Sequence, residues 1–185
     1  VKTMLSAADR AISNMKSTKD NEVDADRLLQ VFSDISKYGE LFQLTGELGF
    51  GEVYHRLLMG YANFVNLYPE EAQNQLNARR NMWTVGEKVI QNWSVLEASE
   101  LFTEREREQI LSALYLTYEA NTRDGYLPGA QAPGPRWNHQ IFPALSLAMA
   151  GRYFENHYDL PETASWKEMG DCVFIGNTSN ISLDE

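Results

Sequence analysis

Trp137, Asn138 and His139 place an indole, an amide and an imidazole side by side, where a proline-rich loop gives way to an apolar helix. An asparagine offers two donors and an acceptor, and histidine can donate whether it is neutral or protonated. Backbone amides near a helix start add positive potential. Such a cluster would bind a carboxylate. The alternative is that Asn138 only caps the helix and His139 is a polar neighbour, and spacing alone favours that simpler interpretation.

Further polar and aromatic side chains stand around the same junction in the sequence: Tyr126, Gln131, Arg136 and Trp137. Arg136 could pair with a second carboxylate or with a sulfate. Tyr126 and Trp137 could attach the loop to the core.

Metal binding is not predicted. His55 and His157 are far apart in the sequence and show no defined ligand spacing, so we expect no metal site and no cofactor. The single cysteine, Cys172, cannot form an intrachain disulfide, and we expect a small buried apolar residue there.

The composition fits one soluble globular domain covering residues 1–185, with 43% hydrophobic and 23% charged residues. A formal net charge of -10 argues against a nucleic acid partner, because there is no run of Lys and Arg to neutralise phosphates. No apolar run approaches the about 18 residues of a membrane span, so none is expected.

Helical periodicity covers almost the whole chain, and it predicts about seven helices in an up-and-down succession. The segments expected to be helical are 2–16, 25–39, 52–68, 70–101 in two pieces, 104–121, one starting between 138 and 141, and 161–175. Gly39 is expected to end the second helix, and the glycine-rich segment 41–52 is expected to form a turn. Thr103 and Glu106 have the spacing of a capping box.

The helix that follows the loop carries small residues all round it, namely Ala144, Ser146, Ala148, Ala150 and Gly151. A helix that is apolar on every side is buried on every side, and small residues let neighbouring helices approach closely. This suits an inner helix of a double-layered ring better than an exposed member of a bundle. We therefore expect an all-α fold, an incomplete (α/α) toroid of antiparallel helical hairpins.

The run RWNHQIFPALSLAMAGRYF, followed by LPETASWKEMG, resembles the toroidal polysaccharide lyases of the heparinase II/III-like and related alginate lyase families. The similarity extends from Pro135 to Ile175. It implies that Asn138, assisted by His139, neutralises the carboxylate of a uronate so that β-elimination can proceed. It also makes Tyr126, Gln131, Arg136 and Trp137 candidate sugar contacts, with the Trp137 indole stacked on the apolar face of a pyranose ring. The implied partner is an acidic polysaccharide or oligosaccharide, and the implied location is secreted or periplasmic, in a bacterium.

Those families also use a tyrosine well downstream of the asparagine as general acid or base. The last tyrosine here, Tyr158, lies too close to Asn138 for that role. We therefore expect this chain to be part of a larger catalytic domain, with the tyrosine outside residues 1–185.

Two other functions stay open. The chain could be a non-catalytic helical interaction module, in which the junction is a cap and the loop or a helix face binds a partner. It could also be a glycoside hydrolase on a similar toroid, which would need two opposed carboxylates. Glu119 and Asp124 lie near the loop, although nothing in the sequence pairs them.

Overall fold

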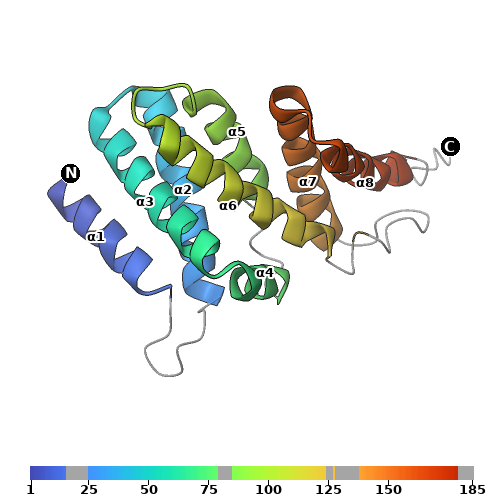
Figure 1. Ribbon diagram of the computed structural model, residues 1–185, viewed down its shortest axis with the longest axis horizontal. Coiled ribbons are helices and arrows are strands. Elements are labelled where there is room, and N and C mark those ends of the chain that lie inside the picture. The colour runs from blue at the N-terminus through green and yellow to red at the C-terminus, as the bar shows by residue number, and fades with distance from the viewer. Residues whose placement is uncertain (16–24, 79–84, 124–126, 128–137, 179–185) are drawn as a thin grey trace, which may run out of the picture.

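The computed structural model describes residues 1–15, 25–78, 85–123, 127 and 138–178. Within these ranges the chain forms helices and no strand, which confirms the predicted all-helical class (Figure 1). The helices are α1 (Lys2–Ser13), α2 (Ala25–Thr45), α3 (Leu48–Leu67), α4 (Pro69–Ala78), α5 (Gly86–Leu96), α6 (Glu104–Thr122), α7 (Asn138–Tyr158) and α8 (Pro161–Thr178). None of the helices in these ranges is both long and apolar enough to cross a membrane.

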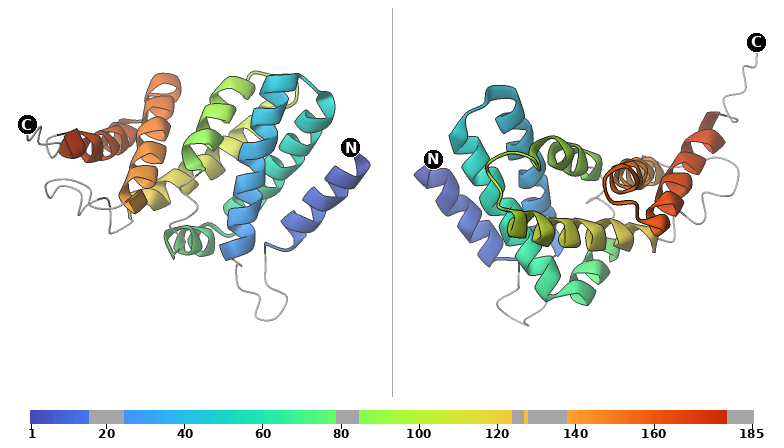
Figure 2. Two further views of the ribbon diagram at one scale, coloured as in Figure 1. Left: turned by 180° about the vertical axis from the view of Figure 1, so that it is seen from behind. Right: turned by 45° about the horizontal axis from the view of Figure 1, so that its top comes forward.

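The helices form two rows. In the first row α5 packs between α2 and α7, and all three run in the same direction, so that their first residues lie at one end of the molecule (Figure 2). In the second row α3 packs between α1 and α6. The two rows contact each other where α2 packs on α3 and where α7 packs on α8. A hydrogen bond also joins the rows, because the Tyr118 hydroxyl of α6 donates to the Gly86 carbonyl of α5 at 2.6 Å.

Helix α7 is covered by α5, α6 and α8. Its small residues Ala144, Ser146, Ala148, Ala150 and Gly151 are all buried, as their distribution around the helix predicted. The contact with α8 is close on both sides. A Cβ added at Gly151 would lie 2.7 Å from the backbone nitrogen of Lys167, and one added at Gly170 would clash with the backbone carbonyl oxygen of Ala144. Backbone meets backbone here because neither glycine has a side chain.

Two glycine-based boundaries are wrong. Gly39 lies inside α2, where an added Cβ would come within 2.8 Å of the Asn92 amide nitrogen. Of the three glycines in the segment 41–52, only Gly46 lies between the helices α2 and α3, with a φ of 68°. Gly51 lies within α3, against the Phe42 ring. Most of these glycines admit a neighbouring side chain and do not interrupt a helix.

The capping box at the start of α6 is confirmed. The Glu106 amide donates to the Thr103 hydroxyl at 3.3 Å, and the Thr103 amide donates to the Glu106 carboxylate at 2.9 Å. These bonds satisfy two amides that the first turn of a helix otherwise leaves without a partner. The bond from the Thr103 amide holds the pKa of Glu106 below its usual value.

The expected burial of Cys172 is wrong, because its side chain is exposed. Helix α8 packs through the face that carries Trp166, Gly170 and Val173, all of them buried, and Cys172 points away from that face. The tryptophans Trp93 and Trp166 are core residues. Trp83 lies outside the described residues.

Replacing Glu106 by Gln should lower the free energy of unfolding by roughly 1 kcal/mol at neutral pH, because the cap loses its charged acceptor. The native-state pKa of Glu106 lies below that of the unfolded chain. Its contribution is therefore complete above about pH 4.5 and is lost as the pH falls through the lowered native value. Urea unfolding of both proteins between pH 3 and 7 should show the two curves converging at acid pH. The exposed Glu108 of the same helix provides the control E108Q, for which a similar loss would contradict a special role of the cap.

Replacing Gly170 by Ala should destabilise the protein by about 1–3 kcal/mol, because the new methyl group meets the α7 backbone. An unhindered helix would instead gain up to about 1 kcal/mol from the same change. Thermal unfolding of G170A measures the sign. The exposed Ala164 provides a reference on the same helix, since A164G should show only the ordinary loss of helix propensity. A more stable G170A protein would contradict the close approach of α7 and α8.

Candidate functional site

Asn138 is the first residue of α7, so the predicted helix start between residues 138 and 141 is confirmed. Asn138 and His139 therefore lie in the first turn of a helix whose central turns are largely buried. Their side chains, and the whole of the other four candidate residues, lie outside what the structure describes: Tyr126, Gln131, Arg136 and Trp137. The structure thus places the backbone of the predicted carboxylate-binding pair and does not test the side chains.

The backbone of this first turn leaves several groups without helical partners. The first amides of any helix have no carbonyl to donate to. Pro143 lies inside α7 and has no amide hydrogen, so the carbonyl of His139 also lacks its usual helical donor. The start of α7 therefore has amides, and one carbonyl, that no helical hydrogen bond within α7 satisfies.

The end of α6 is attached to α7 just behind this turn. The side-chain amide of Asn121 donates to the Pro143 carbonyl at 2.9 Å, and Asn121 is fully buried. Its side-chain oxygen has no hydrogen-bond partner among the described residues. Because a buried hydrogen bond of this kind resists displacement, Asn121 fixes the first turns of α7 relative to α6.

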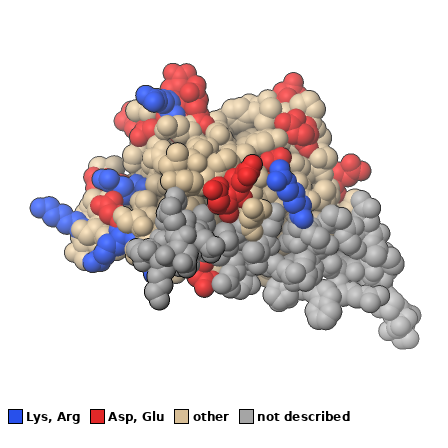
Figure 3. Space-filling model, turned by 60° about the horizontal axis from the view of Figure 1, so that its bottom comes forward, with Lys and Arg blue, Asp and Glu red and all other residues tan. Residues whose placement is uncertain are grey.

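The end of the molecule where α2, α5 and α7 begin carries charges of both signs. Figure 3 shows acidic and basic side chains interspersed over the described part of this face. An acidic ligand that binds here would therefore depend on individual donors such as those of the α7 start. Long-range attraction would contribute little, because the chain as a whole has a net charge of -10.

The opposite end of α7 holds a polar cluster that the sequence reasoning missed. The Tyr153 hydroxyl accepts a hydrogen bond from the Trp93 indole at 2.9 Å and donates to the Glu97 carboxylate. The His157 imidazole lies 3.7 Å from the other Glu97 oxygen and stacks on the Tyr153 ring, with centroids 4.9 Å apart. Burial, followed by the hydrogen bond to Glu97, raises the pKa of Tyr153.

This cluster connects the ends of α5 and α7, and Tyr153 stays protonated within it. The sequence offers one usable signal, since Trp93 stands among the apolar residues Val89, Ile90 and Leu96 and a buried indole needs an acceptor. Nothing in the spacing identified Tyr153 as that acceptor.

His55 is likewise engaged by a carboxylate. Its Nε2 atom lies 3.1 Å from Oε1 of Glu106, so it connects α3 to the cap of α6. Over the described ranges, no group of three or more His, Cys, Asp or Glu side chains is arranged to hold a metal ion.

Glu119, the first carboxylate of the hydrolase alternative, is hydrogen-bonded to neighbouring side chains in α4 and at the end of α6. Its two oxygens accept from the Gln73 amide at 3.0 Å and from the Arg123 guanidinium at 3.3 Å. Asp124 lies outside the described residues. The structure therefore does not test whether the two carboxylates form a pair.

Comparisons with protein-family models, with curated proteins and with solved structures found no match to this chain.

Replacing Tyr153 by Phe should lower the free energy of unfolding by about 1–3 kcal/mol, because the Trp93 indole and the Glu97 carboxylate both lose a partner in a buried setting. Tyr38 supplies the matched control, since its ring packs beside Phe50 and Y38F keeps that ring contact. Urea unfolding of both variants measures the difference. Equal stability of Y153F and the unaltered protein would show that the cluster is only incidental to the α5–α7 contact.

Proposed function

We propose that this chain is part of a polysaccharide lyase that cleaves uronic-acid-containing glycans by β-elimination. The observation that carries the proposal is the position of Asn138 and His139 in the first turn of α7, a helix held by α5, α6 and α8. A rigid helix start of this kind can present donors to a ligand without reorganising.

The arrangement of the helices also supports a toroid. The parallel row of α2, α5 and α7, with partners of opposite direction in a second row, is the pattern that successive helical hairpins generate when they add side by side (Figure 2). Continued in the same sense, such hairpins would form a double-layered ring with α7 in its inner layer.

The chemistry of the proposed site follows from charge. The proton next to a uronate carboxylate is only weakly acidic while that carboxylate keeps its full negative charge. Removing the proton creates an enolate-like dianion on the carboxylate oxygens. Donors from Asn138, His139 and the free amides of the α7 start would stabilise this dianion more than the ground state, which is the condition for faster reaction.

The remaining roles are assigned from the resemblance. Arg136, Trp137, Tyr126 and Gln131 would bind the sugar on either side of the reacting uronate. The proton would be taken by a tyrosine from outside residues 1–185. Such an enzyme would act on polysaccharides outside the bacterial cytoplasm, in keeping with a secreted or periplasmic location.

Replacing Asn138 by Ala should lower the turnover of a uronate glycan by on the order of 100-fold or more, as the loss of one such donor typically does. The assay uses the product of the whole reading frame that encodes the chain, incubated with alginate, heparan sulfate or chondroitin sulfate. Absorbance in the ultraviolet reports the conjugated unsaturated uronate that elimination leaves. The exposed Asn156 in the last turn of α7 provides the matched control N156A, which should keep full activity.

Three other outcomes of this assay would contradict the proposal. Saturated reducing ends without the chromophore would indicate hydrolysis by a pair of carboxylates. An absence of turnover with all three glycans would favour a helical interaction module. Full activity of the Asn138→Ala protein would remove Asn138 from the mechanism.

A further inference from the structure

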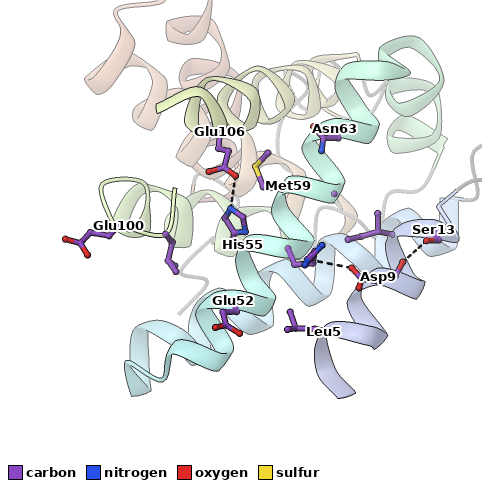
Figure 4. A pocket seen from close by; sticks show the side chains of 13 residues that line it. Leu5, Asp9, Ser13, Glu52, His55, Met59, Asn63, Glu100 and Glu106 are labelled. Atoms are coloured by element: carbon purple, nitrogen blue, oxygen red, sulfur yellow. Dashed lines mark hydrogen bonds and ion pairs between the residues drawn. The ribbon is translucent and has the colours of Figure 1, made fainter. Parts of the chain in front are cut away.

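A groove of about 1020 Å³ lies between α1, α3 and the segment that leads into α6 (Figure 4). It is separate from the α7 start, because α1, α3, the segment before α6 and the first turn of α6 line it and no described residue of α7 does. Helix α1 forms one wall. It packs on α3 and less on α2, and Ala8 is its only buried residue between Lys2 and Ser13.

The floor of the groove is apolar. Leu5 and Ile12 from α1 face Met59 from α3 and Leu101 from the segment before α6. All four pack against the core on one side and are only partly buried. A ligand with its own apolar face would bury this remaining surface, which contributes about 25 cal/mol per Å². Methionine adapts to the shape of what it contacts, so Met59 suits a floor of this kind.

The walls of the groove are acidic. Asp9, Glu52, Glu100 and Glu106 line it, and Arg56 is the only Lys or Arg among the described residues that do so. Arg56 lies 3.7 Å from Asp9, and His55 contacts Glu106. Glu52 and Glu100 are exposed and form no ion pair with any residue in the described ranges. In Figure 4 they lie on two different walls.

We infer that this groove binds a basic amphipathic helix from a partner protein. An apolar floor between acidic walls complements a helix with apolar residues at every third or fourth position and Lys or Arg beside them. Glu52 and Glu100 would pair with the basic residues while the floor receives the apolar ones. A second copy of this chain is a poor occupant, because two proteins with a net charge of -10 repel each other.

The probe for this inference is a fluorescein-labelled peptide in which leucine and lysine repeat at helical spacing. A second peptide has glutamate in place of every lysine. Fluorescence anisotropy should show saturable binding of the lysine peptide that weakens with added salt, and no binding of the glutamate peptide.

The double substitution Glu52→Lys and Glu100→Lys should weaken the affinity for the lysine peptide at least tenfold. Both side chains are exposed, so the fold should persist, which circular dichroism can verify. The control Glu155→Lys and Glu168→Lys makes the same change in net charge at exposed positions of α7 and α8, and should alter binding less than twofold. Changing Leu101 to Asp tests the floor and should also weaken binding.

Equal affinity of the unaltered protein and the Glu52/Glu100 variant would overturn the inference. So would an equal loss in the control variant, since that would reveal only a general attraction to an acidic protein. The Asn138→Ala protein should bind the peptide normally, so failure here and failure of the proposed lyase activity can be told apart.

Discussion

The burial of the small residues in the central turns of α7 is the constraint on which the rest of the structure depends. A helix lined by alanine, serine and glycine offers little surface of its own to the core, so it is stabilised only if its neighbours come close. Gly151 and Gly170 allow α8 to do so at backbone distance. Helices α5 and α6 complete the cover, and as a result the start of α7 has a fixed position relative to both rows.

Buried hydrogen bonds then set the register between neighbouring helices within each row. The hydroxyl groups of Tyr61 in α3 and Thr117 in α6 are hydrogen-bonded at 2.8 Å. The side-chain amide of Asn92 in α5 donates to the backbone carbonyl of Ser36 in α2, also at 2.8 Å. A slip of either helix would leave these groups without partners in an environment where that costs about 1–3 kcal/mol for each. The rows are therefore held by specific contacts as well as by apolar burial. The two ends of α7 differ: a polar cluster around Tyr153 ties one end to α5, and the other end begins at Asn138 with amides that no helical hydrogen bond satisfies.

The sequence predicted well what depends on local chemistry. The Thr103–Glu106 cap and the burial of α7 were both predicted, because each depends on residue types at short spacing. Gly39 and Gly51 were misread because glycine has two uses. A turn and a close helix contact both need the missing Cβ, and only the contact partners, Asn92 and Phe42, decide between them. Cys172 was misplaced because the buried face of α8 depends on where α7 lies. The side chains around Asn138 follow a long segment without periodicity, so no local pattern fixes their direction.

The contact between a uronate carboxylate and the start of α7 can be measured directly by amide nuclear magnetic resonance of the chain. Titration with a short uronate oligosaccharide should shift the amide signals of Asn138, His139 and the two residues that follow them. The same oligosaccharide with its carboxyl groups reduced to alcohols should leave those signals unchanged. Equal shifts with both sugars, or shifts confined to other helices, would contradict a carboxylate-binding role for this turn.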